Sequence, residues 1–184
     1  MASRVRVYLG CSLDGFIAGP NDDISFLHEY GVEAADDAPP SGLDFDGFMA
    51  DVGALLMGRK TYEVAAGFGG PWPYGEHPVL VATHRDLTPK VPTVRAVQGS
   101  IAELVEQARE AADGKDIYLD GGDLVRQALD ACLVDELCLT MLPVILGGEG
   151  VRLFDGLLRT TPLELVSHHD FGQGMVQITA RPRY

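Results

Sequence analysis

Three segments of the sequence join a strand-like apolar run to glycine, hydroxyl or basic residues, a combination that can bind an anion. In residues 55–63 an apolar run passes through Gly58 into Arg59 and Lys60, and Thr61 is expected to cap the helix that follows. Glycine lets the backbone approach a ligand, a helix N-terminus offers free N–H groups, and the two cations add charge. The segment is equally typical of a phosphate site and of a solvated turn between a strand and a helix.

The other two segments repeat this arrangement. Residues 79–85 run from a continuous apolar stretch into Thr83, His84 and Arg85, and residues 119–124 lead through Gly121 and Gly122 into a helix. Each is weak alone: the first is also typical of an exposed loop, and paired glycines are not the GxGxxG dinucleotide fingerprint. Because ligands gather at the carboxyl ends of parallel strands, we expect all three segments on one edge of a sheet.

The elements that must position these segments alternate between strand and helix. Hydrophobic periodicity and capping signals predict strands over 5–9, 54–57, 79–82, 117–119 and 133–145 and helices over 44–51, from Thr61, from the capping box Ser100–Glu103 and from Gly122. Residues 31–43 are expected to form a surface loop, and 162–171 with 175–183 a hairpin. This predicts one domain over residues 1–184 in the α/β class, with helices on both faces of a mixed, mainly parallel sheet and a C-terminal antiparallel hairpin.

Composition excludes several classes of protein. A net charge of −13, from 14 basic and 27 acidic residues, argues against a nucleic-acid partner. No run approaches the ~18 apolar residues of a membrane span, so we expect a cytoplasmic protein without a membrane partner. The three cysteines are expected to be reduced and buried, and without a CxxC cluster no metal site is predicted.

The order of the motifs resembles that of the dihydrofolate-reductase superfamily. MGRKTYE (57–63), VATH (81–84), DGGDLVRQAL (120–129) and DELCLTMLPVILGGEG (135–150) carry a resemblance that spans residues 4–182. LPVILGGEG (142–150) is similar to the C-terminal reductase domain of the riboflavin-pathway deaminase/reductase and its stand-alone relatives, rather than to true dihydrofolate reductases. The H-x-E…PCxxC zinc signature of the deaminase does not occur in the sequence. The resemblance implies a dihydrofolate-reductase-like fold, NADPH as cofactor and a homodimer.

The resemblance also implies which residues bind the cofactor. SLDGFIAG (12–19) would close over nicotinamide and substrate, and phosphate contacts would follow from the three strand-end segments. The implied residues are Gly10, Cys11 and Ile17 for nicotinamide; Gly58, Arg59, Lys60 and Thr61 for phosphates; Thr83, His84 and Arg85 for the adenosine 2′-phosphate; and Gly121, Gly122, Asp123 and Leu124 for the pyrophosphate. Asp123 departs from expectation, because it places a negative charge beside the pyrophosphate.

A substrate-side acid is harder to assign. In folate reductases a carboxylate on the first helix orients the pterin, and the resemblance places Asp44 near that position, with Asp46 as second choice. The alternative is that Asp44 only caps a helix or is solvated. Asp14 is expected to form a turn, and Trp72 and Tyr74 either stack on a substrate ring or pack within their loop.

Three functions are compatible with these residues. The first is an NADPH-dependent reductase similar to 5-amino-6-(5-phosphoribosylamino)uracil reductase, acting on a small heterocyclic or ribosyl substrate. The second is a true dihydrofolate reductase, which the LPVILGGEG segment disfavours. The third is a relative that binds a nucleotide or partner without turnover. The apolar stretch over 137–146 exceeds what one buried face needs and predicts a homodimer of two-fold symmetry.

Overall fold

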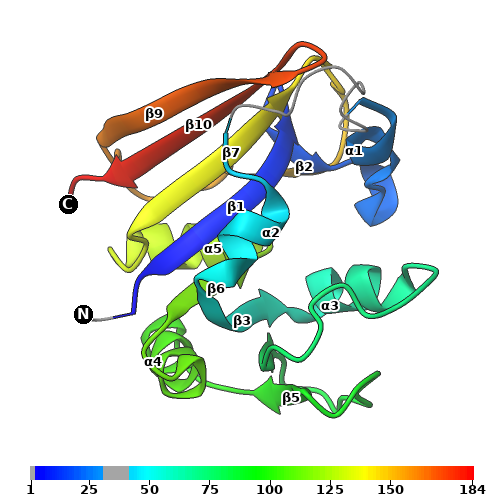
Figure 1. The fold of residues 1–184 in the computed structure, drawn as a ribbon, viewed down its shortest axis with the longest axis vertical. Helices are drawn as coiled ribbons and strands as arrows, with labels where there is room; N and C mark the ends of the chain where they lie inside the picture. Colours follow the sequence, from blue (N-terminus) through cyan, green and yellow to red (C-terminus); the bar gives the residue numbers. More distant parts are fainter. Residues whose placement is uncertain (1–2, 31–41) are drawn as a thin grey trace.

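The computed structural model describes residues 3–30 and 42–184, with an eight-stranded sheet at its centre (Figure 1). The strand order is β5-β4-β3-β6-β1-β7-β10-β9. The strands β5, β4, β3, β6, β1 and β7 are parallel to one another, and β10 is antiparallel to both of its neighbours, β7 and β9. The strands are β1 (Val5–Ser12), β3 (Val52–Gly58), β4 (Val79–Ala82), β5 (Val94–Val97), β6 (Asp116–Asp120), β7 (Glu136–Leu142), β9 (Leu163–Gly172) and β10 (Met175–Pro182). A second, two-stranded sheet pairs β2 (Phe16–Ala18) with β8 (Val151–Arg152).

Helices cover both faces of the large sheet. They are α1 (Ser25–Tyr30), α2 (Phe45–Ala50), α3 (Arg59–Gly67), α4 (Ile101–Ala112) and α5 (Gly122–Asp130), with a 3-10 turn η1 at Pro20–Asp22. Successive residues of β3 point to opposite faces: Leu56 packs in the core beneath α4 and α5, and Leu55 and Met57 pack in the core beneath α2 and α3. Strands buried on both faces explain the continuous apolar runs, and the predicted fold class is confirmed. Among the described residues, no helix is long and apolar enough to cross a membrane.

Several predicted elements are confirmed. The capping box is present, because Ser100 and Glu103 each bond the other's backbone N–H at the start of α4. The hairpin of β9 and β10 turns at Gln173 and Gly174, both at positive φ. The predicted surface loop over 31–43 lies almost wholly outside the described residues.

Two predictions about elements are wrong. Helix α3 begins at Arg59 with Gly58 as its N-cap, so Thr61 lies within the first turn and does not cap it. Strand β7 ends at Leu142 instead of residue 145, because Pro143 has no N–H to continue the ladder. Within the apolar stretch over 137–146, β7 lies between β1 and β10, and the homodimer predicted from this stretch stays a prediction. The sequence analysis also missed elements that are too short to give a periodic signal, namely strands β2, β5 and β8 and helix α1.

Candidate functional site

A cavity of about 800 Å³ lies at the carboxyl ends of four parallel strands. Gly10 of β1, Gly58 of β3, Ala82 of β4 and Asp120 of β6 all reach its wall. The predicted site residues on this wall are Gly10, Ile17, Gly58, Arg59, Lys60, Thr61, Thr83, His84, Gly121, Gly122, Asp123 and Leu124. The parallel sheet thus brings the three strand-end segments together on one edge.

Two helix N-termini face the cavity without a side-chain cap. Gly58 precedes α3 and Gly121 precedes α5, and neither helix receives a capping hydrogen bond from a side chain at this position. Their first N–H groups are therefore available to a ligand, and both helix dipoles favour negative charge there. Gly121 has a φ of +92°, and a Cβ at this position would collide with Oγ1 of Thr61. Glycine is required here so that the two helix starts can lie close together.

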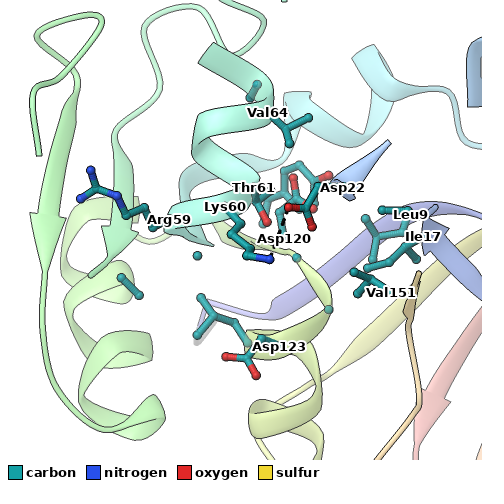
Figure 2. A pocket seen from close by; sticks show the side chains of 18 of the residues that line it. Leu9, Ile17, Asp22, Arg59, Lys60, Thr61, Val64, Asp120, Asp123 and Val151 are labelled. Carbon is teal, nitrogen blue, oxygen red and sulfur yellow. Dashed lines mark ion pairs between the residues drawn. The ribbon is translucent and has the colours of Figure 1, made fainter. Parts of the chain in front are cut away.

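Arg59 lies at one end of the cavity, and aliphatic side chains line the other end. Figure 2 shows Arg59 at the opposite end from Leu9, Ile17 and Val151, with Lys60 between them. Arg59 is held in place: its Nε donates to Glu63 Oε1 at 2.7 Å and its Nη1 to the carbonyl oxygen of Asp86 at 2.9 Å.

The loop between β1 and α1 reaches the same cavity. Lys60 Nζ lies 3.3 Å from Asp22 Oδ2, an ion pair that links α3 to η1 (Figure 2). Ile17 and Ala18 of β2 form part of the wall, and β2 is paired with β8. The loop predicted to cover nicotinamide is thus tied to a second sheet.

Asp14 anchors that loop, in agreement with its predicted place in a turn. Its carboxylate accepts hydrogen bonds from Ser12 Oγ at 2.7 Å and from the N–H groups of Leu146 and Gly147 at 3.1 and 2.9 Å. These bonds, that of Ser12 first, lower the pKa of Asp14 to about 2. The LPVILGGEG segment therefore supplies backbone N–H groups that hold SLDGFIAG in place.

Three of the predicted site residues lie outside the wall of the cavity. Cys11 is buried beside Met141, and burial raises the pKa of its thiol to about 11. Arg85 is exposed and approaches Arg59 only through its carbonyl oxygen, at 3.5 Å. Asp44 is exposed and caps α2, accepting a hydrogen bond from the Gly47 N–H at 2.7 Å. The structure thus gives Asp44 the capping role that was its alternative, and its role as a proton relay stays a prediction.

Asp120 is a titratable wall residue that the sequence analysis did not select. It is the last residue of β6, 6% exposed, and the Tyr74 hydroxyl donates to its Oδ2 at 3.5 Å. Burial raises the pKa of Asp120 to about 6, although hydrogen bonds from the Gly121 backbone and from Tyr118 and Tyr74 act in the opposite direction. A carboxylate directly between an apolar strand and two glycines was the available sequence signal.

Aromatic rings form the wall around Asp120. Tyr8, Phe45, Tyr74 and Tyr118 all line the cavity. The Tyr74 ring also packs against Trp72, with 5.2 Å between ring centroids, so the structure shows the packing that was one of the two predicted roles of this loop; stacking on a substrate ring stays a prediction. Among residues 3–30 and 42–184 no cluster of three His, Cys, Asp or Glu could hold a metal ion.

Known proteins with similar sequences and structures point to one family. A protein of Shewanella sp. PV-4, whose name assigns it to riboflavin biosynthesis, is 27% identical, covers 98% of this chain and 99% of its own, and has a TM-score of 0.84. YwjB of Bacillus subtilis is 27% identical over 176 residues, which are 95% of this chain and 96% of YwjB.

A more distant structure shares the fold. The diaminohydroxyphosphoribosylaminopyrimidine deaminase/5-amino-6-(5-phosphoribosylamino)uracil reductase of Thermotoga maritima is 17% identical, with a TM-score of 0.68, over 99% of this chain and 57% of that protein. The sequence model of the RibD C-terminal domain matches residues 72–177, more than half of the chain. This chain therefore belongs to the RibD C-terminal domain family.

Proposed function

We propose that this chain is an NADPH-dependent reductase that transfers a hydride to a small heterocyclic or ribosyl substrate, as 5-amino-6-(5-phosphoribosylamino)uracil reductase does. The observation that carries this proposal is the pair of uncapped helix N-termini, of α3 and α5, on one cavity wall with Arg59 and Lys60. Two such termini side by side fit the linked phosphates of a dinucleotide. Family membership supports a reductase of this kind.

We assign the parts of NADPH to the cavity in sequence, from the end at Arg59 to the aliphatic end. The N–H groups that follow Gly58 and Gly121 would hold the pyrophosphate, and Arg59, Thr83 and His84 would hold the 2′-phosphate. Leu9, Gly10 and Ile17, at the aliphatic end, would line the nicotinamide. When bound there, NADPH supplies the hydride. The residues of this wall orient the nicotinamide, and Ile17 with Ala18 excludes water from it.

A proton must reach the substrate atom that gains charge. Asp120 is a buried carboxyl group on the wall, and its pKa of about 6 means that its carboxyl oxygen holds a proton over part of the physiological pH range. We therefore assign the proton to Asp120 Oδ2 in this proposal. Asp44, at the start of α2, stays the second candidate.

Cofactor preference tests the proposal. NADPH is expected to bind much more tightly than NADH in calorimetry, because charge-assisted contacts to the 2′-phosphate are worth roughly 1.5–3 kcal/mol each. Arg59→Glu is expected to remove most of this preference. Arg95→Glu, at an exposed position of β5 outside the wall, is a control with the same charge change and is expected to keep the preference. Equal affinities of the wild-type protein for NADPH and NADH would contradict the assignment.

Turnover tests the substrate class. NADPH oxidation is measured with 5-amino-6-(5-phosphoribosylamino)uracil and with dihydrofolate as acceptors. Turnover of the first alone supports the riboflavin-type reaction, and turnover of dihydrofolate alone supports a folate reductase. NADPH binding without turnover of either directs the search to a different acceptor.

A further inference from the structure

The ion pair between Asp22 and Lys60 joins two segments of the cavity wall. Lys60 lies in the first turn of α3, Asp22 is the last residue of η1, and both residues line the cavity. Lys60 Nζ is 3.3 Å from Asp22 Oδ2, and in Figure 2 the pair lies between Arg59 and the aliphatic end. A negative charge of the protein itself therefore pairs with a cation at the helix start to which the proposed function assigns phosphate.

Lys60 differs from the other cations of the wall in what holds it. Arg59 Nη1 and Arg126 Nη1 each donate to a backbone carbonyl oxygen, at 2.9 and 2.8 Å, so the backbone fixes both guanidinium groups. Within the described part of the chain, the ammonium group of Lys60 has Asp22 as its one ion-pair or hydrogen-bond partner, and the Lys60 side chain is 78% exposed. Lysine carries its charge on a flexible four-carbon stem. The ammonium group of Lys60 can therefore move to a ligand while the two arginines stay in place.

The turn that contains Asp22 directs this carboxylate toward α3. Asn21 and Asp22 have φ values of +57° and +59°, in the left-handed region that residues with a Cβ rarely adopt and that Asn and Asp tolerate best. The N–H of Gly19 donates to the carbonyl oxygen of Asp23 at 2.7 Å and closes the turn. Asp22 is thus part of a closed turn with a defined backbone, and this turn places its carboxylate beside Lys60.

The charges of the wall balance one another. Among the described residues, the wall has as many carboxyl groups as arginines and lysines: Asp22, Asp120 and Asp123 against Arg59, Lys60 and Arg126. The wall therefore has little net positive charge with which to attract an anion. Asp22 is the carboxyl group of this set that pairs with the movable cation, so its charge bears most directly on a phosphate at α3.

We propose, on the basis of the reductase function above, that Asp22 competes with the phosphates of the cofactor for Lys60. In the empty cavity Lys60 Nζ pairs with Asp22 Oδ2. When a phosphate group binds at the start of α3, the ammonium group of Lys60 leaves Asp22 and pairs with a phosphate oxygen, and the Asp22 carboxylate becomes solvated. Because one ion pair replaces another, the net gain from Lys60 is small, and the affinity for the cofactor is lower than the cations alone would give.

Calorimetry with pyrophosphate and with NADPH tests the proposal. Asp22→Asn releases Lys60 and is expected to tighten the binding of both ligands roughly 2- to 5-fold, the range for an exposed ion pair. Asparagine tolerates the positive φ at this position, so the turn is expected to keep its conformation. Asp23→Asn, at an exposed position outside the wall in the same loop, is a control with the same charge change and is expected to keep the wild-type affinities.

A double-mutant cycle separates competition for Lys60 from simple charge repulsion. Lys60→Gln removes the shared cation, so adding Asp22→Asn to this variant is expected to change the affinity for pyrophosphate little. An equal gain from Asp22→Asn with and without Lys60 would show that Asp22 only repels the ligand, and would overturn the proposal. Wild-type affinity of Asp22→Asn for both ligands would overturn it as well.

Pyrophosphate also separates this proposal from the cofactor assignment, because it has linked phosphates but neither nicotinamide nor 2′-phosphate. Tighter pyrophosphate binding by Asp22→Asn that depends on Lys60, together with equal affinities for NADPH and NADH, would support the competition and overturn the cofactor assignment. A clear preference for NADPH that Asp22→Asn leaves unchanged in affinity, with no gain for pyrophosphate, would support the cofactor assignment and overturn the competition.

Discussion

Asp120 shows how one buried side chain links the chemistry of the cavity to the stability of the fold. Burial favours the neutral carboxyl group, and the donors nearby are too few to reverse this. The folded protein therefore holds a proton on Asp120 up to a pH of about 6, whereas the unfolded chain releases it near pH 4. Ionisation of Asp120 therefore destabilises the folded state. Groups with such raised pKa values are common at functional sites.

This effect predicts a specific pH dependence of stability. Because the folded pKa is raised, the contribution of Asp120 to the free energy of unfolding is largest below pH 4 and falls as pH rises to about 6. The loss by pH 7 corresponds to about 3 kcal/mol. Urea unfolding of wild type and Asp120→Asn from pH 4 to pH 8 should show the wild type losing stability relative to the variant by about this amount. Parallel pH curves for the two proteins would contradict the raised pKa.

At the scale of elements, the presence or absence of a side-chain cap at the start of a short helix determines whether its first N–H groups are open to the cavity. Helices α3 and α5 leave their first N–H groups to the cavity, whereas α2 uses Asp44 as a side-chain cap. The caps thus distinguish two helices whose first N–H groups face the cavity from a helix that is closed by a side chain. Phe45 and Phe48 of this capped helix, α2, pack beside Tyr8.

Substitution of Asp44 separates the cap from a chemical role. Asp44→Ala is expected to lower the free energy of unfolding by about 1 kcal/mol, because the Gly47 N–H loses its acceptor. Asp44→Asn keeps a good N-cap without the charge, so its stability is expected to match the wild type. NADPH-dependent turnover by Asp44→Asn then tests the charge alone: wild-type turnover restricts Asp44 to the cap, and loss of turnover in a stable variant makes it a proton relay.

At the scale of the whole molecule, the large sheet ends in an edge strand that exposes apolar side chains. Strand β9 leaves Leu163, Leu165 and Val166 50%, 57% and 45% exposed, and Val176 of β10 is 43% exposed. An exposed, apolar edge strand is a surface that proteins normally cover. We therefore predict that these side chains of β9 and β10 pack against the partner in a homodimer.

Mass measurement tests the dimer. Light scattering at micromolar concentration is expected to give twice the chain mass of 19.8 kDa. The double variant Val166→Lys, Val176→Lys places two charges on this surface and is expected to be monomeric. Glu110→Lys, at an exposed position of α4, is the control and should stay dimeric. A wild-type protein with the mass of one chain would contradict the prediction.

The sequence by itself determined the order of the longer elements and the three strand-end segments of the cavity wall. Continuous apolar runs indicate strands buried on both faces, and the glycines and cations that follow them mark the strand ends, because both signals depend on neighbours in the chain. Gly58, Gly121 and Gly122 were predicted for this reason and line the cavity. The capping box of Ser100 and Glu103 also depends only on neighbouring residues, and for this reason the sequence predicted it.

The tertiary structure decided that Asp120, rather than Asp44, lines the cavity. Both are acids next to a helix start, but Asp44 is exposed and bonds its own helix, whereas Asp120 is buried and bonded by Tyr74, which lies 46 residues earlier in the chain. The burial of Asp120, and with it the raised pKa, depends on contacts between segments far apart in the chain. The sequence places an acid between an apolar strand and two glycines, but only the fold shows that this acid is buried at the cavity.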